Sequence, residues 1–165
     1  MSLPVMVRLG PDSGGNFEYG WSNHYLEAHV ISDVGKKREH NEDSCVLCAP
    51  EDIDLLQDRG YVFAVADGMG GHTAGQLASR LATAGTVEAL RKVQGTEASL
   101  TEKLRYCVAA ANRNVFDTAQ AKPELSGMGT TLVALLTGPG RVALAHVGDS
   151  RAYLIRAGRI RQPTD

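Results

Sequence analysis

Apolar and polar residues repeat with different periods in three successive parts of the chain. Short apolar segments come first, at residues 26–32, 44–48 and 61–66, and their length is typical of strands. Two longer segments follow in which apolar residues recur every three or four positions, as on one face of a helix. The remainder returns to short apolar segments separated by glycine-containing turns, which predict β-hairpins. This order indicates an α+β fold rather than alternating βαβ units.

The two predicted helices are defined by their apolar positions. The first begins near Gln76, and its apolar face consists of Leu77, Leu81, Ala84, Val87 and Leu90. The apolar face of the second consists of Leu100, Leu104, Cys107, Val108, Ala111 and Val115. Ser99 and Thr101 are the candidate N-caps of this second helix.

Two hairpins are predicted in the C-terminal part of the chain. Residues 130–136 pair with residues 142–147 around the turn Gly138-Pro139-Gly140, and residues 152–155 pair with residues 159–161. By contrast, residues 1 to about 25 are polar and rich in Gly, Ser and Asn, which predicts a loosely attached N-terminal extension. We therefore expect the folded domain to comprise residues 26–165.

Composition and charge exclude several classes of protein. The chain has 17 basic and 19 acidic residues, a net charge of −2 and no basic stripe, so neither nucleic acid nor a membrane surface is an expected partner. No apolar run approaches the ~20 residues of a membrane span, and residues 1–20 lack the apolar region of a secretory signal. The three cysteines, Cys45, Cys48 and Cys107, form no disulfide framework. We expect reduced thiols and a cytoplasmic location.

The most informative segment surrounds Asp67. The continuous apolar run of residues 61–66 predicts a strand buried on both faces, and it ends in this carboxylate. Four glycines and a histidine follow within eight residues, before the first helix. Three interpretations remain open: a metal ion on the Asp67 carboxylate and the Gly68 carbonyl, a phosphate on backbone N–H groups, or a turn with a surface acid.

Two further clusters place acids next to strand ends. Residues 32–44 contain Arg38, Glu42 and Asp43, and residues 146–151 contain Asp149. All-oxygen ligands select hard cations such as Mg²⁺ or Mn²⁺, and a pair of such ions can activate a shared water. An arginine fork binds phosphate. The residues thus indicate metal-assisted hydrolysis of a phosphate ester, while the motifs Gly-x-Ser-x-Gly and His-Glu-x-x-His are absent.

The clusters resemble the bacterial metal-dependent Ser/Thr protein phosphatases of the protein phosphatase 2C type. Four blocks occur in the order found in that family: Ser32-Asp33-x-Gly35-x-x-Arg38-x-x-Asn41-Glu42-Asp43, Ala66-Asp67-Gly68-Met69-Gly70-Gly71-His72, Gly127-Met128-Gly129-Thr130-Thr131 and His146-Val147-Gly148-Asp149-Ser150-Arg151. The resemblance implies a four-layer α-β-β-α sandwich of two antiparallel sheets flanked by helices, incomplete here at the C-terminus. It also implies removal of phosphate from phosphoserine and phosphothreonine by a metal-activated water, with Ser/Thr kinases or their targets among the signalling substrates.

The same resemblance implies roles for individual residues. Asp67 would bridge two Mn²⁺ or Mg²⁺ ions, and the Gly68 carbonyl would bind one of them. Glu42 and Asp43 would act mainly through metal-bound waters, and Asp149 would contribute to a third metal site. The two catalytic candidates are Arg38, which would hold the substrate phosphate, and His72, which is either the general acid for the leaving group or a cap of the following helix. His40 and His146 are assigned to structure, and Thr130 and Thr131 to strand packing near the site.

The resemblance also leaves an alternative open. Family members continue beyond the position of Asp165 and carry two further aspartate blocks that complete the two-metal centre, and we find no substitutes for them within residues 10–165. The alternative function is therefore a non-catalytic, phosphatase-like binding module. A chain of this extent would also expose strand edges, which predicts self-association or a covering segment.

Overall fold

The computed structural model describes residues 5–50, 60–93 and 97–164, and among these the side chains of all but Val5, Pro50 and His72. The sequence also predicts an acidic loop at residues 50–60, and most of it lies outside the described residues. The strands are β1 (Val5–Gly10), β2 (Phe17–Ser22), β3 (Glu27–Ser32), β4 (Asp43–Pro50), β5 (Val62–Met69), β6 (Gly129–Thr130), β7 (Leu132–Gly138), β8 (Arg141–Val147), β9 (Leu154–Arg156) and β10 (Arg159–Arg161). The helices are α2 (His72–Val93), α3 (Leu100–Ala121) and a 3₁₀ turn, η2 (Pro123–Leu125). In the described part of the chain, no helix is long and apolar enough to span a membrane.

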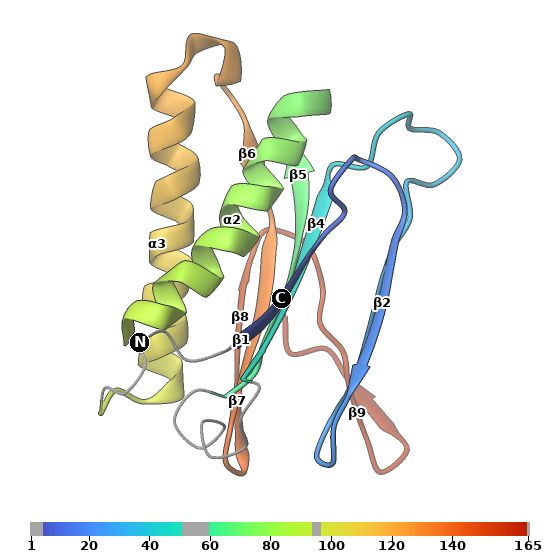
Figure 1. Ribbon diagram of the computed structural model, residues 1–165, viewed down its shortest axis with the longest axis vertical. Coiled ribbons are helices and arrows are strands. Elements are labelled where there is room, and N and C mark those ends of the chain that lie inside the picture. The colour runs from blue at the N-terminus through green and yellow to red at the C-terminus, as the bar shows by residue number, and fades with distance from the viewer. Residues whose placement is uncertain (1–4, 51–59, 94–96, 165) are drawn as a thin grey trace.

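One antiparallel sheet organises these elements. Its strands follow the order β1-β4-β5-β7-β8, and the short β6 pairs with the end of β5. Helices α2 and α3 cover one face of this sheet, and the hairpins β2–β3 and β9–β10 lie on the other side (Figure 1). The α+β class is confirmed, and the described residues supply one helical layer, the main sheet and two small two-stranded sheets.

Strand β5 is buried on one face and half open on the other, so the prediction of a strand buried on both faces is wrong. Val62, Ala64 and Ala66 are buried beneath the helices, whereas Val65 is 47% exposed. The alternation arises because helices cover only one face of this antiparallel sheet in the described structure. The strand also continues through Gly68 to Met69, so Asp67 lies inside a strand rather than at its end.

Helix α2 begins at His72, four residues before the expected start, and lies very close to the sheet. Its buried positions are small residues: Ala74, Ala78, Ser79, Ala82, Thr83, Thr86 and Ala89, with Val87 and Leu90 towards its end. Leu77 and Leu81 are only partly buried. The Ser79 hydroxyl donates to the Glu42 carbonyl at 2.6 Å, and the hydroxyls of Ser44 and Thr83 are 2.9 Å apart. Small side chains bring this helix within hydrogen-bonding distance of strand β4.

Helix α3 agrees with its sequence pattern. Leu104, Cys107, Ala111 and Val115 are buried, as their spacing predicts. Ser99 is the N-cap, and its side chain and that of Glu102 form a reciprocal capping box. The hydrogen bonds with Ser99 lower the pKa of the Glu102 carboxyl.

The N-terminal segment is part of the sheet, so the prediction of a loosely attached extension is wrong. All six residues of β1 pair with β4, from Val5 opposite Pro50 to Gly10 opposite Cys45. Strand β2 pairs with β3, and Tyr19 and Trp21 pack against the second face of the main sheet. The short apolar segment of β1 is followed by the polar residues 11–16, and the average polarity of this region concealed a strand that gains its stability from pairing with β4.

The three cysteines are buried, and none of them forms a disulfide within the described residues. Cys45 and Cys48 lie three residues apart on β4 and therefore point to opposite faces. Burial raises the pKa of the Cys45 and Cys107 thiols to about 11, so both remain protonated and unreactive near neutral pH.

Close backbone contact beneath α2 leaves no space for an added methyl group at Gly68. A Cβ atom there would overlap the Gly75 carbonyl and lie 2.6 Å from the Glu42 carbonyl oxygen. We expect Gly68→Ala to lower the free energy of unfolding by roughly 1–3 kcal/mol or more, measured by urea denaturation. The matched control is Gly129→Ala on the paired strand β6, where the nearest atom is a Met69 side-chain carbon at 3.6 Å. Equal stability of the two variants would contradict the close-contact explanation.

Candidate active site

Two carboxylates face each other across neighbouring strands. Asp43 on β4 and Asp67 on β5 are directly opposite in the antiparallel register, next to the pair Ser44–Ala66. Ser44 contacts α2, so alternation along the strands places both aspartates on the face turned away from the helices. Directly opposed side chains have Cβ atoms about 5 Å apart, and like charges at this spacing repel each other.

This repulsion changes the titration of Asp43. Burial of its carboxyl group, the negative charge of Asp67 and a hydrogen bond with Asp67 raise the pKa of Asp43 to about 6, although the positive charge of Arg38 opposes the shift. Near pH 6, a proton therefore lies between the two carboxyl groups in about half of the molecules. A divalent cation can replace that proton and remove the repulsion.

The backbone of Asp67 is held by the two threonines of the third sequence block. The Thr131 N–H donates to the Asp67 carbonyl at 2.9 Å, and the Thr131 hydroxyl accepts the Asp67 N–H at 2.9 Å. The Thr130 hydroxyl donates to the same carbonyl at 2.9 Å, and the Thr131 hydroxyl lies 2.7 Å from that of Ser150. These residues do more than pack the strand, because they fix the position from which the Asp67 carboxylate projects.

Glu42 and Gly68 lie where β4, β5 and the first turn of α2 meet. The Gly68 N–H donates to the Glu42 carbonyl at 3.2 Å, and the Glu42 carboxylate packs against Gly75, where a Cβ atom would collide with it. The glycines at 68 and 75 are therefore required by this three-way crossing. Glu42 carries its carboxylate at the N-terminal end of α2, as the motif places it.

Most of the predicted site residues line one cleft of about 800 Å³. They are Arg38, Glu42, Asp67, Gly68 and Asp149. Asp43 lines an adjoining hollow of about 280 Å³, which shares Asp67 with the main cleft. His72 is the first residue of α2, and its side chain lies outside the described residues. The structure thus brings together segments that are more than 100 residues apart in the sequence.

Several cleft residues were missed by the sequence analysis. Lys37 and His40 line the same cleft, although His40 was assigned to structure. Their closeness to Arg38 in the first motif block, where Lys37 directly precedes it and His40 follows two residues later, was the available signal. His146, also assigned to structure, has a buried Nδ1 atom without a hydrogen-bond partner in the part of the chain that the structure describes.

The oxygen-rich chemistry of the cleft fits a hard divalent cation. Asp43 and Asp67 provide a facing carboxylate pair, with Asp149 and Glu42 near the same space. Among the described residues, however, no group of three His, Cys, Asp or Glu side chains is close enough to hold a metal ion. The residues thus fit a cation that is held by two carboxylates and takes its remaining ligands from backbone or water oxygens. They do not form a closed cage of side chains.

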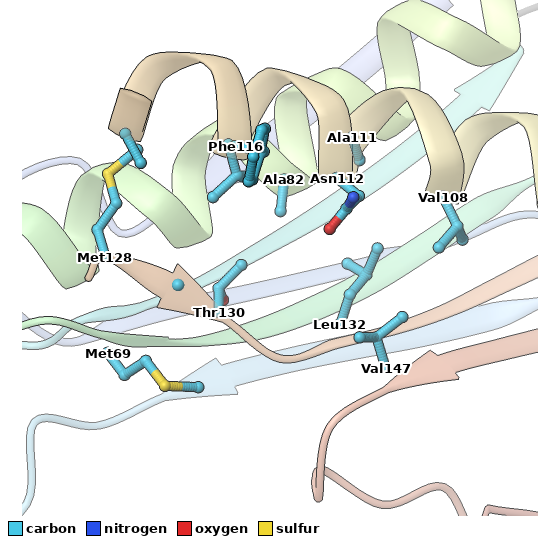
Figure 2. A pocket seen from close by; sticks show the side chains of 13 residues that line it. Met69, Ala82, Val108, Ala111, Asn112, Phe116, Met128, Thr130, Leu132 and Val147 are labelled. Atoms are coloured by element: carbon cyan, nitrogen blue, oxygen red, sulfur yellow. The ribbon is translucent and has the colours of Figure 1, made fainter. Parts of the chain in front are cut away.

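A second hollow, of about 260 Å³, has a different character. Figure 2 shows it between α3 and the sheet, with Phe116, Val108, Leu132 and Val147 among its lining residues. None of the residues that line it is charged, and Met69 is the only lining residue that it shares with the main cleft. This hollow therefore lacks the charged groups that line the cleft around Asp67.

Comparisons with known proteins agree with this location. The family model described as protein phosphatase 2C matches residues 35–165. The serine/threonine protein phosphatase PstP of Mycobacterium tuberculosis is 41% identical over 135 residues, which cover 81% of this chain and 23% of that protein. The serine/threonine phosphatase stp of Listeria monocytogenes is 34% identical over 142 residues, covering 85% of this chain and 54% of the relative.

Solved structures give the same result for the fold. The PstP catalytic domain in complex with two manganese ions superposes with a TM-score of 0.64 and 32% identity, over 98% of this chain and 56% of that one. The chain spans about a quarter of the PstP sequence and about half of the Listeria relative. The family model covers most of the chain, including all of the cleft residues, and the chain therefore belongs to the protein phosphatase 2C family.

Proposed function

We propose that this protein is a metal-dependent phosphoprotein phosphatase that removes phosphate from phosphoserine and phosphothreonine. The observation that carries the proposal is the facing pair Asp43–Asp67 beside a cleft that also contains Arg38. Relatives named as serine/threonine phosphatases, and a related catalytic domain solved with two manganese ions, support it.

Individual residues of this chain would have distinct roles in this reaction. Asp43 and Asp67 would hold Mn²⁺ or Mg²⁺, with the Gly68 carbonyl as a further oxygen and Asp149 and Glu42 available to additional ions or their waters. Such a cation supplies Lewis-acid activation of water. Arg38 would bind and orient the phosphate through paired N–H donors, and the threonine contacts would keep the Asp67 carboxylate in place. His72 is proposed as the proton donor to the leaving alkoxide.

The substrate class is also part of this proposal. A phosphorylated protein, such as a Ser/Thr kinase or one of its targets, presents a phosphomonoester that the open cleft can admit. Buried cysteines without disulfides support a reducing compartment, and we propose the cytoplasm.

A second candidate is a phosphatase-like module that binds phosphoproteins without hydrolysing them. The observation that favours it is that the described residues contain no group of three potential metal-binding side chains. Cation affinity separates the two candidates, because a catalytic centre must bind its cation and a pure binding module need not.

Removal of the central carboxylate should abolish hydrolysis. We expect Asp67→Asn to lower the rate on a phosphothreonine peptide with Mn²⁺ by at least about a hundredfold, since metal activation contributes several kcal/mol to catalysis. Asp117→Asn, on an exposed position of α3, is the matched control and should retain the wild-type rate. Similar rates for both variants would show that Asp67 has no role in the chemistry.

Cation binding should compete with protonation of Asp43. Because the pKa of Asp43 is raised to about 6 without metal, the affinity for Mn²⁺ should be nearly constant above pH 7 and fall up to about tenfold per pH unit below pH 6. The same shift means that the cation-free protein loses stability as pH rises from about 4 through 6, and that bound cation restores it. Isothermal titration calorimetry at pH 5, 6 and 7.5 measures the first effect. Affinity that does not change with pH would exclude Asp43 as a ligand, and no binding at pH 7.5 would favour the non-catalytic module.

A further inference from the structure

The loop that carries Arg38 connects β3 to β4 and spans residues 33–42; we call it the site loop. It is rich in charged, exposed side chains, and it has no regular secondary structure of its own. Lys37 and Arg38 nevertheless both line the cleft. A loop of this kind needs fixed contacts elsewhere to hold its positively charged side chains in one place.

Those contacts come from the turn between β1 and β2. At one end of the site loop, the Val34 N–H donates to the Asn16 side-chain oxygen at 2.9 Å, and the Asn16 amide donates to the Asp33 carboxylate at 3.1 Å. The second Asp33 oxygen accepts the Gly35 N–H at 2.6 Å. Asn16 thus closes the first bend of the loop, where Gly35 has a φ of +75°.

The other end of the site loop is held by the same turn. The Asn41 N–H donates to the Gly14 carbonyl at 2.7 Å, and the Asn41 side-chain amide donates to the Gly15 carbonyl at 3.2 Å. Asn41 is only 4% exposed, and its side-chain oxygen accepts the Asp43 N–H at 3.0 Å. Both ends of the site loop therefore rest on three consecutive residues, 14–16.

This turn lies outside the part of the chain that matches the family model, which begins at residue 35. It is fixed in turn by β1 in the main sheet and by Arg80 of α2, which donates to the Asp12 backbone carbonyl at 2.9 Å. The ion pair of Arg80 with the exposed Asp12 carboxylate, at 3.2 Å, adds little to this contact. The N-terminal segment is thereby connected to the sheet, to α2 and to the site loop.

We propose that the turn of residues 14–16 is a brace for phosphate recognition and that Asn16 is a positioning residue for Lys37 and Arg38. Asn16 contacts only the first bend of the site loop, whereas the aspartate pair lies on strands β4 and β5. Its loss should therefore weaken the binding of the phosphorylated substrate and leave cation binding unchanged. The link to substrate binding rests on the proposed phosphatase function, but the bracing of the loop does not.

The test compares Asn16→Ala with Asp12→Ala, a variant in the same turn whose side chain contacts α2 instead of the site loop. Limited trypsin digestion reports on the loop directly, because Lys36, Lys37 and Arg38 are exposed cleavage sites. We expect Asn16→Ala to be cut there about tenfold faster than wild type, and Asp12→Ala at the wild-type rate. For a phosphothreonine peptide with Mn²⁺, KM should rise about tenfold in Asn16→Ala, while kcat and the Kd for Mn²⁺ change less than about threefold.

The possible results distinguish failure of the brace from failure of the positioning role and of the proposed function. Unchanged cleavage in Asn16→Ala would overturn the brace, and faster cleavage with an unchanged KM would overturn the positioning role. A fall in kcat and in Mn²⁺ affinity that accompanies the rise in KM would also overturn it, because it would indicate a general loss of structure. If the wild-type protein does not hydrolyse the peptide, the proposed function fails, and the trypsin comparison still decides whether residues 14–16 brace the loop.

Discussion

The repulsion between Asp43 and Asp67 is the constraint on which the site depends. Antiparallel pairing of β4 with β5 places the two carboxylates opposite each other, and the partial burial of Asp43 prevents water from screening the pair fully. The fold retains this unfavourable pair, although two apolar residues would stabilise the sheet. The physical explanation is a ligand that carries positive charge, and a hard divalent cation satisfies the oxygen donors present.

The surrounding structure keeps that pair in place through backbone contacts. Threonines 130 and 131 bind the main chain of Asp67 on one side, and α2 approaches the other side so closely that Gly68 and Gly75 have no space for a Cβ atom. Arg38 reaches the same cleft from a loop without regular structure, so its position depends on a turn near the N-terminus. The sheet thus holds the proposed cation ligands, and the braced loop holds the residues proposed to bind phosphate.

Features that involve residues close together in the chain were predicted from the sequence, whereas features that depend on long-range strand pairing were not. The apolar spacing and the capping box of α3, the turns of both C-terminal hairpins and the four motif blocks all involve residues close in the chain. The opposition of Asp43 and Asp67 depends on long-range pairing, so a residue expected to act through water proved to face the central carboxylate. Strand β1 was missed because it is stabilised by pairing with β4. Helix α2 was predicted, but its start and its buried face were misplaced, because that face is built mainly from alanine, serine and threonine rather than leucine.

Carbon-13 NMR titration of the Asp43 carboxyl group, with and without saturating Mg²⁺, tests the central claim most directly. Without cation, the account predicts a midpoint at about pH 6, far above the ordinary value for aspartate, because the group is buried beside Asp67. With Mg²⁺, the midpoint should fall by more than one unit, since the cation stabilises the ionised form. An ordinary midpoint near 4 that is unchanged by Mg²⁺ would contradict the claim that this pair is a cation site.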